Sequence, residues 1–209
     1  MSSSEQGGWA NPGPAGLTAL AVACFTFYSI LTPHLGPDGK AIVGTQAPLL
    51  ACWLIGGFVV QLVVAIIEFK EGALIGGNVF LVFCAFFMLT GGLEFVIKSY
   101  FAAVGPKAVP LDTIIDGWAW LVLLITLILW TPCYLKTAPA ALGLTVLILD
   151  VGVFFVCFGD LQLLNATMAH HWAALALLLT GIFGMYVAAG IQLNTAFGKT
   201  ILPLGKPLI

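Results

Sequence analysis

Six long apolar runs take up most of the chain. They cover residues 14–35, 48–69, 73–97, 114–134, 139–158 and 171–197. A helix crosses the hydrocarbon core of a bilayer with about 20 mostly apolar residues, so each run is long enough for one span. Only 8% of the residues are charged, whereas a soluble domain carries about 25%. The sequence therefore predicts an all-α integral membrane protein with six transmembrane helices, and the lipid bilayer is its main solvent.

The charged residues exclude several function classes. The chain has seven lysines, no arginine and a formal net charge of -2, so it offers neither a basic patch for nucleic acid nor the arginine forks typical of phosphate sites. The sequence has no HExxH, GxSxG or P-loop motif, and its cysteines lie singly in apolar runs. We therefore expect no enzyme activity, no cofactor and no metal, and passage of a solute remains the plausible chemistry.

The predicted organisation is a single membrane domain with short ends. Residues 1–13 form an N-terminal segment, 14–198 the six-helix domain and 199–209 a C-terminal tail. An even number of spans places both termini on one side. If that side is the cytoplasm, four lysines lie on the inner side and three on the outer side, which weakly favours cytoplasmic termini. We expect the protein in the cell (inner) membrane.

An aspartate stands in the middle of the fifth run. Asp150 follows Pro139 by eleven residues, which is about 16 Å along a helix and close to the bilayer midplane. A charge at that depth costs about 2.5–3.5 kcal/mol. One interpretation is a proton site or a pore-lining group. The other is an acid that bonds to a hydroxyl or amide and serves helix packing.

Two amides also fall inside spans. Gln61 lies thirteen residues into the second run, and Asn78 lies inside the third. Such amides either join helices by hydrogen bonds or bind a solute, and the sequence leaves both interpretations open.

Both ends of the chain resemble a known family. Residues 11–17 read NPGPAGL and resemble the NPAPLGL signature of the acetate uptake transporter family, which includes the succinate–acetate permeases. Residues 186–205, YVAAGIQLNTAFGKTILPLG, are similar to that family's last helix and tail. Gly57, Gln61, Glu68, Phe69 and Gly72 match its G-x-x-x-Q…E-[FY]-x-x-G pattern. The resemblance covers nearly the whole chain, from residue 10 to residue 205.

The resemblance implies six helices around a central pore in each subunit, assembled as a ring that is typically a hexamer. It also implies cytoplasmic termini and passage of acetate, and in some members succinate, by proton-coupled symport or through an anion channel. The family's apolar constriction falls on Leu20, Phe83 and Leu149. Two departures are that Phe83 replaces a tyrosine and that Asp150 stands where relatives often carry a hydroxyl residue.

These inferences combine into a mechanism. We expect a small monocarboxylate to be bound by Asn11, Gln61 and Asn78, whose amides can donate to its oxygens. It would then cross the apolar constriction, and Asp150 is the candidate for coupling to protons. A channel for a small neutral solute such as ammonia or urea is the alternative, favoured by an apolar pore beside an acid. A third class is a membrane sensor or assembly factor that transports nothing.

Overall fold

Helices make up almost all of the computed structural model, which describes residues 8–32, 46–105 and 111–209. In chain order they are α1 (Gly13–Leu31), α2 (Ala47–Lys70), α3 (Leu74–Val82), the π-helix η1 (Phe83–Leu89), α4 (Thr90–Val104), α5 (Ile114–Thr137), α6 (Ala140–Asp160) and α7 (Ala166–Phe197). Because α3, η1 and α4 run on as one continuous helix, the described chain has six helices long and apolar enough to cross a membrane. The predicted all-α membrane architecture is confirmed.

Local signals explain where several helices begin and end. Proline occupies the first turn of α1 and of α2, where its missing N–H has no intrahelical partner to lose. The Asn165 side chain accepts from the Met168 N–H and caps α7. Gly198 ends α7 in the left-handed conformation, at φ 62°, which glycine adopts without strain. The sequence predicts that the sixth span begins at residue 171. The Asn165 cap starts α7 five residues earlier, at Ala166.

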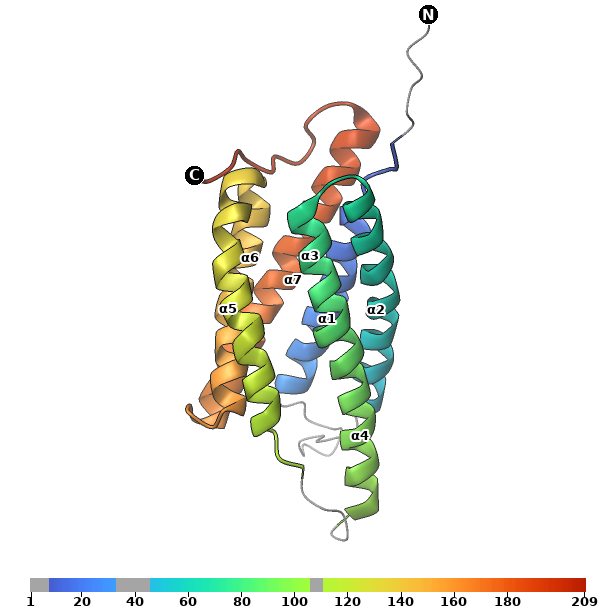
Figure 1. Cartoon of the computed structure of the whole chain (residues 1–209). Coiled ribbons are helices and arrows are strands. Elements are labelled where there is room, and N and C mark those ends of the chain that lie inside the picture. Colours follow the sequence, from blue (N-terminus) through green and yellow to red (C-terminus); the bar gives the residue numbers. More distant parts are fainter. Residues whose placement is uncertain (1–7, 33–45, 106–110) are drawn as a thin grey trace, which may run out of the picture.

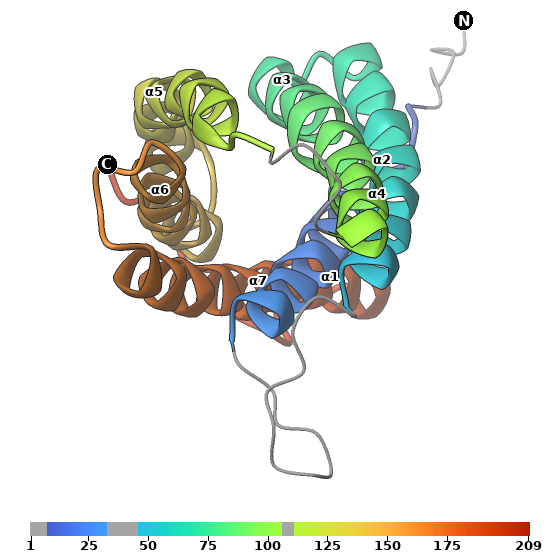
Figure 2. The same ribbon diagram turned by 90° about the horizontal axis from the view of Figure 1, so that it is seen from below.

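The helices stand side by side around a central axis. Seen along that axis, α5, α6, α7, α1, α2 and the α3–α4 helix follow one another in a ring (Figure 2). The closest pairs are α1 with α7 and α6 with α7, and the ring closes where α3 approaches α5. The first described residues and the C-terminus lie at the same end of the bundle (Figure 1). We call this end the terminal end and the opposite one the distal end.

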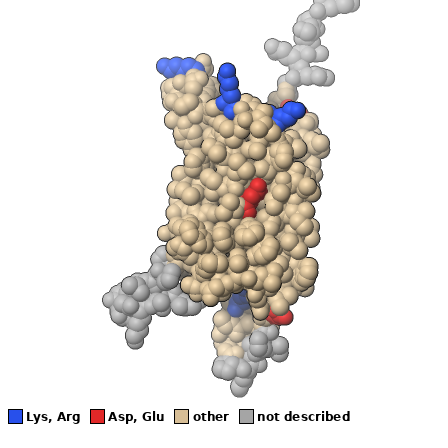
Figure 3. Space-filling model, turned by 90° about the vertical axis from the view of Figure 1, so that its left-hand side faces the viewer, with Lys and Arg blue, Asp and Glu red and all other residues tan. Residues whose placement is uncertain are grey.

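The outer surface is suited to lipid. Many large apolar side chains on it are more than half exposed, including Val59, Ile66, Val122 and Leu129. Lysines gather at the terminal end, whereas the face formed by α5 and α6 is apolar apart from acidic atoms at mid-height (Figure 3).

The third span is not a uniform α-helix. Its middle, Phe83–Leu89, is π-helical, and the Thr90 hydroxyl donates to the Ala85 carbonyl five residues earlier at 3.0 Å. The sequence predicts one helix over 73–97 and gives no sign of this wider turn. The span also continues to Val104, beyond the predicted end.

The C-terminal tail is fixed across the terminal end by hydrogen bonds. The Asn194 amide accepts from the Ile201 and Leu202 N–H groups at 2.6 and 3.0 Å and donates to the Leu202 carbonyl at 2.8 Å. Further along, the Leu208 N–H donates to the Leu135 carbonyl of α5 at 2.8 Å. The tail therefore ties α7 to α5.

We expect Asn194→Ala to lower the free energy of unfolding by about 2–3 kcal/mol, because it leaves partly buried tail groups without partners. Thermal unfolding in detergent measures the change. Thr195→Ala is the matched control, since Thr195 is exposed. Equal melting temperatures for the two variants would show that the Asn194 hydrogen bonds to the tail do not stabilise the fold.

Candidate functional site

A cavity of about 710 Å³ occupies the axis of the bundle at its terminal half. Residues of α1, α2, α3, η1, α5, α6 and α7 line it, so every span contributes to its wall. Its mouth includes Asn11 before α1, Gly72 and Ala73 after α2, and Ala138 after α5. The cavity therefore opens at the end where both termini lie.

The three residues of the expected constriction meet at this cavity. Leu20 of α1, Phe83 of η1 and Leu149 of α6 all line it, and they are 8%, 5% and 5% exposed. The three side chains come from different sides of the ring and are apolar, so they can close a path to hydrated ions. The structure brings them together; that they control passage stays a prediction.

Gln61 places a polar group deep in the same cavity. Its side chain is 1% exposed, and its Nε2 donates weakly, at 3.4 Å, to the Gly16 carbonyl of α1. Its Oε1 is buried without a hydrogen-bond partner. A buried acceptor without a donor costs about 1–3 kcal/mol. Because an amide nitrogen has two N–H groups and one is used on Gly16, Gln61 keeps one donor, as the sequence-based mechanism expected, and also an unpartnered acceptor.

Small residues of the N-terminal motif, residues 11–17, allow the contact between Gln61 and α1. The Asn11 Oδ1 accepts from the Gly13 N–H at 2.8 Å at the start of α1. A Cβ on Gly16 would overlap the Phe80 ring of α3, so only glycine lets the two helices approach this closely. The Gly16 carbonyl is thereby held where Gln61 can reach it. Asn11 lines the cavity as expected, with its acceptor already used.

Asn78 does not belong to this site. Its Nδ2 donates to the Leu74 carbonyl of its own helix at 2.8 Å, and it does not line the cavity. A side-chain amide can donate to a carbonyl on the preceding turn of its own helix. The position of Asn78 within a span was therefore not enough to predict that it faces the pore.

Asp150 also lies away from the cavity. It is partly buried at mid-height of α6, where the Thr131 hydroxyl of α5 donates to its Oδ2 at 2.7 Å, while its Oδ1 has no partner. Of the two interpretations left open, this geometry matches the acid that joins two helices through a hydroxyl. The structure does not test the coupling role expected from the sequence, and we expect Asp150 to act in helix packing instead.

We expect Asp150→Asn to leave the rate of acid uptake into proteoliposomes, and its dependence on pH, close to those of the unmodified protein. The amide oxygen can still accept from Thr131, and the group is outside the cavity wall. Uptake measured across imposed pH gradients tests this. If Asp150→Asn abolished the pH dependence of uptake, Asp150 would take part in proton coupling after all.

Other polar side chains, not proposed from the sequence as binding residues, line the cavity. They are Glu68, Tyr134, Thr137 and Thr145. Thr145 is 1% exposed and donates to the Ala141 carbonyl, so its hydroxyl proton is already used. Glu68 fits beside Gly76, where an added Cβ would lie 2.5 Å from its Oε2. Its place in the matched family pattern is the sequence signal that could have assigned Glu68 to the cavity.

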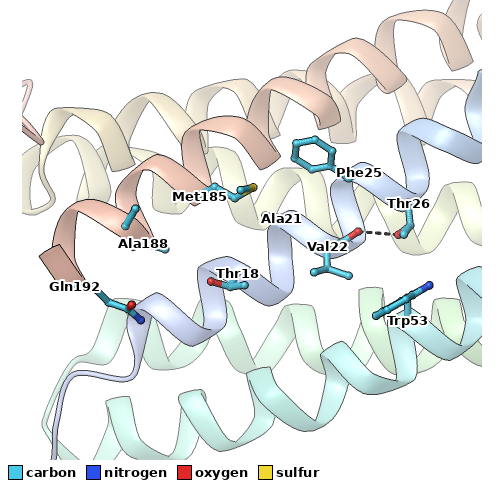
Figure 4. A pocket seen from close by; sticks show the side chains of 10 residues that line it. Thr18, Ala21, Val22, Phe25, Thr26, Trp53, Met185, Ala188 and Gln192 are labelled. Atoms are coloured by element: carbon cyan, nitrogen blue, oxygen red, sulfur yellow. Dashed lines mark hydrogen bonds between the residues drawn. The ribbon is translucent and has the colours of Figure 1, made fainter. Parts of the chain in front are cut away.

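A second hollow lies on the outside of the bundle, between α1, α2 and α7 (Figure 4). Trp53 and Met185, which line it, are more than half exposed. The hydroxyls of Thr18 and Thr26 donate to carbonyls of their own helix, so the hollow presents a mainly apolar wall. It is separate from the axial cavity.

Comparisons with known proteins show relatives of the same fold. No family model matches the chain. The succinate-acetate/proton symporter SatP of Escherichia coli strain K12 is 22% identical over 197 residues, which cover 94% of this chain and 96% of SatP. SatP of Shigella flexneri gives the same values. A solved structure of the bacterial acetate channel SatP matches with a TM-score of 0.71 and 22% identity, over 94% of this chain and 99% of that one. The chain has the SatP fold. The resemblance read from the sequence motifs is confirmed.

Proposed function

We propose that the protein carries small carboxylic acids, acetic acid first and succinic acid second, across a membrane through the axial cavity and the constriction of Leu20, Phe83 and Leu149. The cavity, the apolar ring at its end and the likeness to a symporter and a channel for these acids support this. The observation that carries the proposal is the buried, unpartnered Oε1 of Gln61 in the cavity wall.

The Gln61 acceptor and the charges of the cavity wall together favour the protonated form of the acid. A neutral carboxylic acid has an O–H that can donate to Oε1, whereas a carboxylate has only acceptors. The described wall of the cavity contains no Lys, Arg or His and includes the acidic Glu68. An anion there would find no countercharge and would meet a carboxylate of the same sign.

The charged groups at the distal end are consistent with a neutral permeant. Lys98 of α4 bonds to Glu94 and to Asp116, both at 3.2 Å. The pair with Glu94 has the i,i+4 spacing of neighbours on one helix face. Because two carboxylates share this ammonium, its positive charge is compensated and offers little attraction to an acid anion.

The proposal is tested with purified protein in lipid vesicles. Labelled acetate is added outside, and its early uptake is compared with that of protein-free vesicles, which report diffusion of the neutral acid through lipid. We expect the protein to raise uptake above that background and unlabelled propionate to compete. Competition by urea or ammonium instead, or uptake equal to the background, would contradict the function.

A second measurement separates the neutral acid from the anion. Potassium gradients with valinomycin set the membrane potential, and a trapped pH dye reports protons. If the acid crosses in neutral form, uptake is insensitive to the potential and acidifies the lumen. Faster uptake with a positive interior and no acidification would show that the anion is carried.

We further propose that the protein assembles as a hexameric ring in the inner membrane with both termini in the cytoplasm. The outer hollow of about 690 Å³ on α1, α2 and α7 offers a neighbouring helix a place to pack (Figure 4). The partly exposed Asp150 on α6 would be costly against lipid, and a neighbouring subunit could cover it. Native mass spectrometry tests the number of subunits, and cleavage of the tail from one side of sealed vesicles tests the orientation.

A further inference from the structure

Five aromatic rings fill the bundle on the distal side of the constriction. Phe87 of η1 is their centre: it stacks on Phe27 of α1 at 5.1 Å between centroids and meets Trp120 of α5 edge-on at 5.9 Å. Phe83 approaches Phe87 at 6.0 Å, and Phe95 of α4 approaches Phe27 at 5.7 Å. Four different elements thus supply one continuous cluster.

This cluster lies where the cavity would have to continue. The cavity reaches Phe83, and the other four rings do not line it. Phe87 is about one helical turn past Phe83, and Phe27 is seven residues, about 10 Å, past Leu20 towards the distal end. The partners of Phe87 come from α1 and α5, which stand on different sides of the ring of helices (Figure 2). Phe87 is 5% exposed, so its ring is buried in the interior.

The backbone under Phe87 is unusual. Phe83 and Phe87 both belong to the π-helix Phe83–Leu89, a conformation that is rare and often marks functional sites. Its wide turn holds one residue more than an α-helical turn. Returning that residue to an α-helix would turn the following side chains by about 100° around the axis. A change of this kind would swing Phe87 around the helix axis, together with the side chains that follow it in α4.

We propose that η1 is a second, aromatic gate on the acid path and that Phe87 is a specificity-determining residue. The Phe87 ring closes the distal half of the path and limits the size of the acid that passes, while the π-helix provides the backbone movement that opens it. This proposal rests on the proposed function.

The test compares Phe87→Ala with Phe86→Ala. Phe86 is the adjacent phenylalanine in the same π-helix, but it is 57% exposed on the outer surface. Both variants are reconstituted into vesicles, and uptake of acetate and of the bulkier benzoate is measured above the protein-free background. We expect Phe87→Ala to raise acetate uptake roughly tenfold, equivalent to about 1.4 kcal/mol of barrier, and to raise the ratio of benzoate to acetate. Phe86→Ala should change neither quantity.

Each outcome decides between the proposals. If the unmodified protein carries acid and Phe87→Ala matches it in rate and ratio, the gate is excluded and the function stands. If the unmodified protein carries no acid, both fall. A rise in both variants would mean general loosening and would also exclude the gate. Should Phe87→Ala fail to fold, Phe87→Leu gives the answer, because it keeps the site apolar: a higher benzoate ratio supports the gate, and an unchanged ratio rejects it.

Discussion

Replacing Leu149 with tryptophan is expected to reduce acid uptake to the level of protein-free vesicles. Leu149 lines the inner end of the axial cavity and is 5% exposed, beside Leu20 and Phe83. An indole is far larger than an isobutyl group, and the adjoining cavity of about 710 Å³ leaves it space to turn into the path. The overpacking penalty of about 1–3 kcal/mol is therefore reduced, while the constriction is filled.

Leu147→Trp is the matched control for this experiment. It lies on the same helix two residues earlier and is 38% exposed on the outer surface, so a larger side chain there meets lipid. We expect its uptake to stay close to that of the unmodified protein. Equal loss in both variants would show that tryptophan disturbs α6 generally, and full activity in Leu149→Trp would place the acid path elsewhere.

The sequence predicted the architecture because the physical signal for it is strong. Six apolar runs of spanning length have no stable arrangement other than membrane helices, since lipid leaves backbone groups no other partners. Proline and glycine then marked several helix ends, as at α2 and after α7. The π-helix was not predicted, because the apolar pattern of residues 83–89 is the same for α-helical and π-helical winding.

The candidate site was predicted only in part, because the sequence does not fix which face of each helix points to the cavity. Leu20, Phe83, Leu149 and Gln61 do line one cavity, but their assignment came mainly from aligned motifs. Asp150 and Asn78 both lie inside spans, yet one bonds across to α5 and the other to its own backbone. Depth in a membrane follows from residue counting. The direction of a side chain depends on how six helices are rotated against one another, and small differences in apolar pattern do not fix it.

The direction of the Gln61 hydrogen bond could not be predicted from sequence either. A glutamine can donate and accept, and only the position of the Gly16 carbonyl determines that one N–H of Nε2 is used while the other N–H and Oε1 are left over. The unpartnered acceptor lets Gln61 bind an acid that donates its own proton, in addition to any oxygen held by the remaining N–H. It also provides a route to proton coupling in which the proton crosses bound to the acid.

Gln61→Leu is accordingly expected to lower acetate uptake about tenfold at low acetate concentration, the effect of losing one hydrogen bond worth about 1.4 kcal/mol. Leucine has a similar volume and is apolar, so the cavity keeps its shape while the acceptor disappears. Gln192→Leu serves as the control, since Gln192 lines the outer hollow and not the axial cavity. Gln61→Glu should retain part of the activity, and most of it at low pH, where its carbonyl oxygen still accepts without a charge. Uptake that is unaffected by Gln61→Leu would remove the hydrogen bond from the mechanism and leave the apolar ring alone to select the solute.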